Sequence, residues 1–469
     1  MRNFVFNEVM KIRRQTLMKL AQNFESGNYE NILKIPKEIY PLDKNDPNIY
    51  RDREILKQRI KILLGMDYEK SKDIELYEIV KNMDLILSEK SPYSPDNKYI
   101  QIIKEACDMC PSGRYYVTDL CRNCVAHSCV NVCPRNAITF ERDRARINYD
   151  ICVNCGMCAN ACSYYAIVKL ERPCKKACPV DAITEDENGA AEIKYENCVN
   201  CGSGYISCPF GAIETPSDLL KVLNEMKKNN EVIAIFAPSI ISQFGPRVKI
   251  GQLKKALKEV GFSDVLEVSI GADEVAKEEA ELIKNSNKLY TTSCCPAFVE
   301  YIKKYQKEFI DNISPALSPM TTLAQKLKNK TNAKIVFIGP CIAKKKEAKD
   351  FKVVDYVLTF EELGALFISK KIEPSNYEEE EINGTAYGWI FAKSGGVSEA
   401  VKEYAKKDIK ILKIDGLKNA KEVFMKVKGE EYNLIEGMAC EGGCISGPGI
   451  ITNPKLANNA LKRFTNINI

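Results

Sequence analysis

Histidine is almost missing from this chain: its 469 residues include only His127. A single histidine excludes a catalytic histidine dyad and any metal site built from several imidazoles. No apolar run reaches the roughly 20 residues of a membrane-spanning helix, so we expect no membrane contact. The chain also lacks a strong excess of either charge, because its 68 basic and 63 acidic residues leave a net charge of +5. This balance, with no recognisable binding motif, argues against nucleic acid as a ligand.

We also expect no export signal at the amino-terminal end of this sequence. Residues 1–8 lead directly into a charged helical pattern, with neither an apolar core segment nor a small-residue cleavage site. We therefore expect a cytoplasmic protein, in a reducing compartment where thiols bind metal rather than form disulfides. That expectation governs the interpretation of the 20 cysteines.

Composition divides the chain into three regions. Residues 1–100 lack cysteine and show helical periodicity broken by proline-containing turns, which predicts an N-terminal α-helical region. Residues 101–215 hold 15 of the 20 cysteines. Residues 217–469 alternate helical patterns with apolar strand-like runs, among them Tyr356–Phe360 and Trp389–Ala392. The alternation predicts an α/β domain with a parallel sheet. A Cys-Pro-x-x-Ala-Ile segment occurs three times in the middle region, at residues 133–138, 178–183 and 208–213.

Two interlocked cysteine motifs in the middle region are typical of two-cluster ferredoxins, which predicts an α+β ferredoxin-like region. They are Cys121-x2-Cys124-x4-Cys129-x3-Cys133 and Cys152-x2-Cys155-x2-Cys158-x3-Cys162. In such pairs the fourth cysteine of one motif binds the cluster of the other, which a zinc ribbon would not need. We expect His127 to be a hydrogen-bond donor near cluster sulfur rather than a ligand. The two expected [4Fe-4S] clusters are bound by Cys121, Cys124, Cys129 and Cys162, and by Cys133, Cys152, Cys155 and Cys158.

The other seven cysteines of this region are less regular, because Gly204 occupies the third ligand position after Cys198 and Cys201. By resemblance to the four-motif iron–sulfur subunits of molybdenum oxidoreductases, a third cluster would be bound by Cys107, Cys110, Cys174 and Cys208. The fourth site would retain only Cys178, Cys198 and Cys201. It could hold a [3Fe-4S] cluster, a [4Fe-4S] cluster with a non-cysteine ligand, or nothing. Alternatively, the five cysteines from 174 to 208 share one cluster, so one or two further clusters are expected.

The last five cysteines lie in three loops of the C-terminal region, each just after a short apolar run. Loops at the carboxyl ends of parallel strands meet in one crevice, so three distant segments can bring their thiols together. Four thiolates suffice for a cubane iron–sulfur cluster, which leaves one thiol for chemistry. The loops are Thr292-Ser293-Cys294-Cys295-Pro296, Pro340-Cys341-x2-Lys344-x2-Glu347 and Met438-Ala439-Cys440-x-Gly442-Gly443-Cys444.

These three loops resemble the active-site signatures of [FeFe]-hydrogenases, over about residues 217–469. The resemblance implies an H-cluster, a cubane joined to a diiron subsite that carries carbon monoxide, cyanide and a bridging azadithiolate. Lys344 would donate a hydrogen bond to a cyanide, and Cys294 would relay protons to the azadithiolate. Glu279 and Ser314 match further positions of the proton path. The cubane would be bound by Cys295, Cys341, Cys440 and Cys444, the last of which would also bridge to the diiron subsite.

Three positions depart from the family pattern and indicate a divergent branch. Gly339 stands where the family commonly has methionine, and Pro448 interrupts the glycine run after Cys444. Leu282 occupies the next acidic position of the usual proton path, although Glu281 is adjacent. The sequence therefore does not assign the residues of the outer part of the proton path.

The resemblance implies an oxygen-sensitive ferredoxin hydrogenase that catalyses the reversible reaction of two protons and two electrons to H2. Ferredoxin or a similar one-electron carrier would exchange the electrons, and dedicated maturation proteins would supply the cofactor. The first alternative is a sensor of H2 or redox state with low turnover, and the second is a non-catalytic iron–sulfur assembly protein. Cys294 and Lys344 favour the enzyme, because sensory branches often lack the thiol and assembly relatives generally lack both groups.

Overall fold

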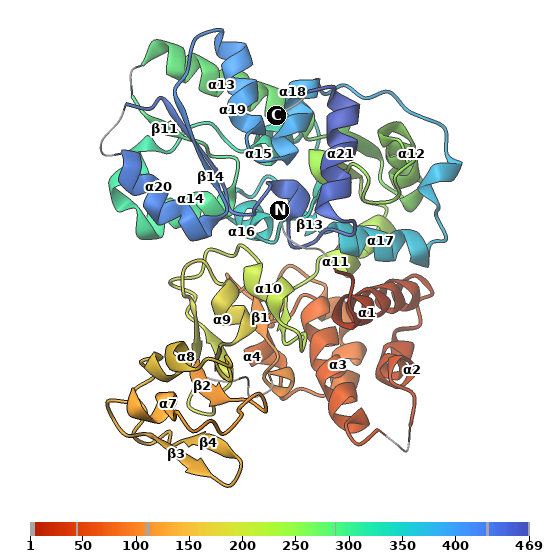
Figure 1. Cartoon of the computed structure of the whole chain (residues 1–469). Helices are drawn as coiled ribbons and strands as arrows, with labels where there is room; N and C mark the ends of the chain where they lie inside the picture. Colours follow the sequence, from red (N-terminus) through yellow and green to blue (C-terminus); the bar gives the residue numbers. More distant parts are fainter. Residues whose placement is uncertain are drawn as a thin grey trace.

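The computed structural model describes residues 5–43, 46–107, 110, 113–286, 288–427 and 431–467. In Figure 1 the first half of the chain, red to yellow, lies against one side of the green-to-blue second half. None of the helices in these ranges is both long and apolar enough to cross a membrane.

The chain begins with helices that pack against both later regions. Asn7 caps the first helix by accepting a hydrogen bond from the Met10 amide, at 3.0 Å. Leu17, Leu20 and Phe24 then form a buried stripe that packs against the second half of the chain. The helices are α1 (Glu8–Glu25), α2 (Ile35–Ile39), α3 (Ile49–Leu63), α4 (Tyr68–Ser71), α5 (Leu76–Lys81) and α6 (Met83–Ile86).

Two similar cysteine-rich modules follow, each with an antiparallel hairpin, a second antiparallel strand pair and two short helices. The outer module, at the lower left of Figure 1, contains β2 (Arg114–Val117), α7 (Ser128–Asn131), β3 (Ile138–Glu141), β4 (Arg144–Ile147), α8 (Met157–Ala161) and β5 (Ile167–Leu170). The inner module contains β1 (Gln101–Ile102), α9 (Pro173–Ala177), β6 (Ile183–Glu185), β7 (Ala191–Ile193), α10 (Ser203–Ser207) and β8 (Ile213–Glu214).

The second half holds two parallel sheets rather than one. The larger has the strand order β10-β9-β12-β13 and the smaller β11-β15-β14. Apolar β-branched and aromatic residues fill the central strands, which are buried on both faces as parallel sheets require. The strands are β9 (Val232–Phe236), β10 (Asp264–Glu267), β11 (Tyr290–Thr291), β12 (Lys334–Ile338), β13 (Tyr356–Leu358), β14 (Ile411–Asp415) and β15 (Leu434–Met438).

Helices connect and cover these strands (Figure 1). One strand prediction is wrong: Trp389–Ala392 continues helical structure, because Thr385 caps a helix there by accepting from the Gly388 amide at 3.3 Å. A short buried apolar run has no periodicity that separates strand from helix. The helices are α11 (Leu219–Lys227), α12 (Ile250–Val260), α13 (Ser269–Asn285), α14 (Pro296–Tyr305), α15 (Pro319–Lys328), α16 (Ala343–Phe351), α17 (Phe360–Ser369), α18 (Ala386–Trp389), α19 (Gly396–Ala405), α20 (Ala420–Val427) and α21 (Pro454–Thr465).

Buried charges hold the N-terminal helices against both later regions. Glu214, at the end of the inner module, pairs with Arg13 at 3.0 Å and with Arg59 at 3.2 Å. Glu361 on α17 pairs with Arg14 at 2.9 Å and accepts from the Tyr205 hydroxyl at 3.2 Å. Removal of one charged residue would leave its partner buried without a counter-charge, which is strongly destabilising. The ion pairs therefore favour one arrangement of the N-terminal helices against the two later regions.

Candidate active site

The three cysteine loops follow the ends of β11, β12 and β15, as the sequence predicts for convergent loops. Strands β11 and β15 are neighbours in the smaller sheet, and the Gly437 amide donates to the Thr292 hydroxyl across them at 3.2 Å. The third loop reaches the larger sheet, because the Gly449 amide donates to the Pro340 carbonyl at 2.8 Å. The site therefore lies between the two sheets.

One cavity of about 70 Å³ gathers most of the predicted residues. Apolar side chains close the rest of its wall, among them Met320, Phe337 and Phe391. Cys440 stands just outside, where burial and the nearby Cys341, Cys295 and Cys444 thiols raise its pKa well above the ordinary value. The predicted residues that line the cavity are Cys294, Cys295, Cys341, Cys444 and Lys344.

Burial decides the state of these thiols. It raises the pKa of Cys444 to about 12 and that of Cys294 well above the ordinary value. Both are therefore neutral thiols when no metal ion is bound. Bound iron would reverse this preference for its ligands, because a coordinated thiol is deprotonated.

Lys344 is fixed at the cavity wall by three contacts of its ammonium group. The group pairs with Glu347 at 2.5 Å, donates to the Ser318 hydroxyl at 2.9 Å and donates to the Cys294 carbonyl at 3.3 Å. Burial lowers the pKa of Lys344, but the Glu347 carboxylate outweighs it and the pKa is raised. The side chain is therefore a permanent positive charge in an apolar cavity.

Gly339 is explained by the packing beside it. An added Cβ would lie 2.6 Å from the Phe337 ring and 3.1 Å from the Ala237 Cβ. The Phe337 ring fills the space beside the cavity, so a side chain at residue 339 has no room.

Glu279 lies on α13 and is 2% exposed. Burial raises the pKa of its carboxyl to about 7, although the Ser314 hydroxyl and the Ser293 amide act in the opposite direction. Neither group completes a hydrogen bond, so both carboxyl oxygens lack a partner in the described structure. One helical turn away in either direction the residues are apolar: Val275, Ala276, Leu282 and Ile283.

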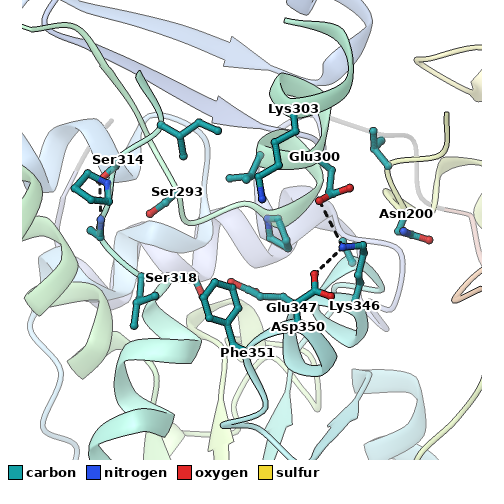
Figure 2. A pocket seen from close by; sticks show the side chains of 18 residues that line it. Asn200, Ser293, Glu300, Lys303, Ser314, Ser318, Lys346, Glu347, Asp350 and Phe351 are labelled. Carbon is teal, nitrogen blue, oxygen red and sulfur yellow. Dashed lines mark hydrogen bonds and ion pairs between the residues drawn. The ribbon is translucent and has the colours of Figure 1, made fainter. Parts of the chain in front are cut away.

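A second cavity, of about 270 Å³, opens between α14 and α16. Figure 2 shows Ser293 and Ser314 at one end of it. Toward the other, Lys346 pairs with Asp350 at 2.6 Å and with Glu300 at 3.5 Å. The cavity therefore extends from the surroundings of Glu279 to a charged mouth.

Sequence reasoning did not single out Ser293 or Ser318 as site residues. Ser318 caps α15 by accepting from the Thr321 amide at 3.4 Å. A serine directly before Pro319 is a readable helix-start signal, but its contact with Lys344 depends on tertiary structure.

The accessory cysteines fall into groups around the two modules. Two sets each line one cavity: Cys133, Cys152, Cys155 and Cys158, and Cys107, Cys110, Cys174 and Cys208. Cys129 lies near Cys121 and Cys162, and Cys124 is half-buried in the loop between Cys121 and Cys129. Cys178, Cys198 and Cys201 are mutual neighbours, and Cys201 also lies near Cys295. The structure thus groups Cys174 and Cys208 with Cys107 and Cys110.

Each group supplies three or four thiols, the number of ligands that an iron–sulfur cluster uses. Among the described residues, no three His, Cys, Asp or Glu side chains converge on one ion. A cubane instead spreads its ligands over separate corners, which fits thiols placed around a cavity. The ring of His127 stacks on Phe140 at a centroid distance of 4.0 Å, and its contact with cluster sulfur stays a prediction.

Comparison with known proteins agrees with this arrangement. Residues 230–448 match the C-terminal domain of the iron-only hydrogenase large subunit. The chain is an [FeFe]-hydrogenase-like protein. Residues 168–219 match the LdpA Fe–S cluster-binding domain and residues 145–168 a 4Fe-4S binding domain, so it is also an iron–sulfur protein. The predicted fold class is confirmed: a parallel-sheet α/β domain preceded by a ferredoxin-like region.

Individual relatives of this [FeFe]-hydrogenase-like chain are distant. Iron hydrogenase 1 of Clostridium pasteurianum is 29% identical over 390 residues, 67% of each chain. A probable cytosolic Fe–S cluster assembly factor of Drosophila melanogaster is 26% identical over 50% of this chain and 66% of its own. A solved [FeFe]-hydrogenase from Chlamydomonas reinhardtii is 21% identical over 52% of this chain and 88% of its own, with a TM-score of 0.46. The chain spans about two thirds or less of the length of the curated relatives it matches.

Proposed function

We propose that this chain is a hydrogenase that interconverts H2 with two protons and two electrons at an H-cluster. One observation carries the proposal: a fixed ammonium and a spare thiol face the same apolar cavity as the cysteines. Cys295, Cys341, Cys440 and Cys444 would hold the cubane, and Cys444 would bridge to the diiron subsite. When bound, this group supplies the iron chemistry that splits or forms H2.

The donor set fits that group. Four half-buried thiols around one cavity match the corners of a cubane, and a fifth thiol remains. Apolar walls keep bulk water out, which strengthens every electrostatic contact inside the cavity. Lys344 would present its charge to an anionic ligand such as cyanide, through a charge-assisted hydrogen bond.

Proton transfer falls to side chains that are not ligands. Cys294 would exchange a proton with Glu279, and each group would lose one proton as it gains another. The carboxyl suits this task, because its pKa of about 7 lets it hold or release a proton near neutral pH. From Glu279 the proton would pass to the Ser314 hydroxyl and then to water in the cavity between α14 and α16. The residues of α13 that share the face of Glu279 one turn away are apolar, so the proposed route leaves the helix at Ser314.

Electrons would travel through the two modules. The inner module packs directly on the catalytic loops, because the Cα of Gly202 faces Pro448 and Ile342. In the outer module Cys155 is exposed, and the adjacent Val153 is 58% exposed. A one-electron carrier such as ferredoxin would dock there. The inner module would connect the catalytic site to the outer module, and the outer module would present a cluster to the electron carrier. Both modules would therefore be needed for electron transfer.

The test is H2 evolution from reduced viologen by protein prepared without oxygen and supplied with the diiron cofactor. We expect turnover by the unchanged chain and its loss in Cys294→Ala, with cluster and cofactor content unchanged. Glu281→Gln is the control, because this glutamate is exposed on the helix that carries Glu279. Turnover that survives Cys294→Ala would contradict the proton role.

The likeness to an Fe–S cluster assembly factor supports a second candidate, a non-catalytic iron–sulfur protein. That candidate predicts intact accessory clusters with no H2 evolution even when diiron cofactor is offered. A sensor would differ from both, with bound cofactor and only slow turnover.

A further inference from the structure

The inner module repeats the outer one in backbone detail. Backbone amides donate to cysteine sulfurs at three matching places, with equal or similar distances. In the outer module the donors are Ala137 to Cys133 at 3.3 Å, Ala145 to Cys121 at 3.5 Å and Ala166 to Cys162 at 3.4 Å. In the inner module they are Ala182 to Cys178 at 3.2 Å, Ala191 to Cys107 at 3.2 Å and Ala212 to Cys208 at 3.4 Å.

The ligand loops also match residue by residue. Asn154 and Asn200 have φ of 54° and 55°, and Gly156 and Gly202 both have φ of 80°. Such left-handed residues turn the chain so that successive cysteines face one point. The repeat therefore assigns each outer cysteine a corresponding position in the inner module.

One counterpart is missing. Cys158, the third ligand position of the outer loop, corresponds to Gly204, which lies on α10 as Cys158 lies on α8. The inner site keeps three thiols, Cys178, Cys198 and Cys201, which correspond to Cys133, Cys152 and Cys155 in the outer module.

Apolar groups occupy the place of the missing thiol. A Cβ at Gly204 would lie 3.0 Å from the tip of Ile183 and 3.2 Å from the tip of Ile213. Both isoleucines are buried. The hydroxyl of the neighbouring Ser203 lies 3.3 Å from the Cys201 sulfur and is thus engaged with a proposed ligand. An iron at this corner would meet apolar side chains and no thiolate.

We propose that Cys178, Cys198 and Cys201 bind a [3Fe-4S] cluster, with the vacant corner directed at Ile183 and Ile213. Three thiolates satisfy the three irons of such a cluster, and the apolar corner needs no ligand. The assignment of a cluster rests on the chain's iron–sulfur modules; only its electron-transfer role rests on the proposed hydrogenase function.

The three-thiol site lies beside the loops of the proposed catalytic site. Gly202, in the same loop, packs so closely on the catalytic loops that an added Cβ would lie 2.8 Å from Pro448 and 3.1 Å from Ile342. Cys341 and Cys444 belong to those loops. The three-thiol site is therefore the accessory site next to the proposed catalytic cluster. An oxidised three-iron cluster is all-ferric and takes up one electron, so this site would be the first to exchange electrons with the proposed catalytic cluster.

The test uses the full chain with its iron–sulfur clusters reconstituted without oxygen, and needs neither the diiron cofactor nor H2. After mild oxidation, electron paramagnetic resonance should show the half-integer-spin signal of a three-iron cluster, close to one spin per chain. Oxidised four-iron clusters are diamagnetic and give no such signal. Iron analysis supplies a second readout.

Two substitutions at one position make the assignment specific. Gly204→Cys should remove the signal and add one iron per chain, because the isoleucine tips can yield to the new side chain. Gly204→Ala adds the same Cβ without a thiol and should keep the signal. Cys201→Ala should abolish it while leaving the iron of the outer module in place.

Two results would overturn the proposal. One is an oxidised chain without the signal, and the other is a signal that survives both Gly204→Cys and Cys201→Ala and so belongs to another cluster. Absence of H2 turnover would refute the hydrogenase function alone and would leave these spectra unchanged.

Discussion

Replacing Glu279 with glutamine should stabilise the chain at high pH and leave its stability at low pH nearly unchanged. The carboxyl is buried on α13 without a hydrogen-bond partner, and burial raises its pKa from 4.5 to about 7. The folded state therefore holds this proton more tightly than the unfolded state. Its contribution to stability is fully present below pH 4.5 and is lost as pH rises through 7.

The magnitude follows from the gap between those values. Each pKa unit corresponds to about 1.4 kcal/mol, so full ionisation costs the folded state about 3 kcal/mol. Between pH 5 and pH 8 most of this cost develops, about 2.5 kcal/mol. Glutamine has no charge to desolvate, so the stability difference between Glu279→Gln and the unchanged chain should widen by that amount.

The assay is denaturant unfolding of both proteins at the two pH values, followed by a probe in the catalytic half. Glu281→Gln is the matched control, because it makes the same chemical change at an exposed position of the same helix. A stability difference for Glu279→Gln that stays constant from pH 5 to pH 8 would refute the reasoning. So would an equal widening in the control.

Three further substitutions test other parts of the account. Glu214→Ala should lower the free energy of unfolding by about 3–5 kcal/mol, since it leaves Arg59 buried without its carboxylate and Arg13 with only the Glu361 contact at 4.0 Å, and proteolysis should then release the N-terminal helices. Val299→Trp should fill the cavity between α14 and α16 and slow H2 turnover about tenfold or more; Val299→Ile should not, and equal rates in both would contradict the proton route. Lys344→Met should prevent retention of the diiron cofactor and cost about 3–5 kcal/mol by stranding Glu347. Adding Glu347→Gln should restore the stability but not the cofactor, and cofactor retention by either variant would contradict the role of Lys344.

Much of the architecture could be predicted from the sequence, because local patterns determine it. Strand-like runs before Cys341 and Cys440 indicate the loops that converge, and the spacing from Cys121 to Cys162 indicates an interlocked pair of sites. The strand predicted at Trp389–Ala392 is wrong, since a short buried segment carries no periodicity and Thr385 caps a helix there.

The rest depends on tertiary contacts that no local pattern encodes. The grouping of Cys107 and Cys110 with Cys174, more than sixty residues later, is predicted only from the resemblance to four-motif subunits and not from a local pattern. The reason for Gly339 is the ring of Phe337, two residues earlier on the strand. The cavity between α14 and α16 exists only when two helices distant in sequence come together. These features decide how protons and electrons would reach the site, whereas the motifs decide what chemistry it would hold.

The most direct measurement of the central claim is infrared spectroscopy of the chain prepared without oxygen and supplied with the diiron cofactor. We predict carbon monoxide and cyanide stretching bands that shift when H2 is admitted, and that no longer shift in Cys294→Ala although the bands remain. A chain with intact accessory clusters that shows no such bands would contradict the assignment of an H-cluster to Cys295, Cys341, Cys440 and Cys444.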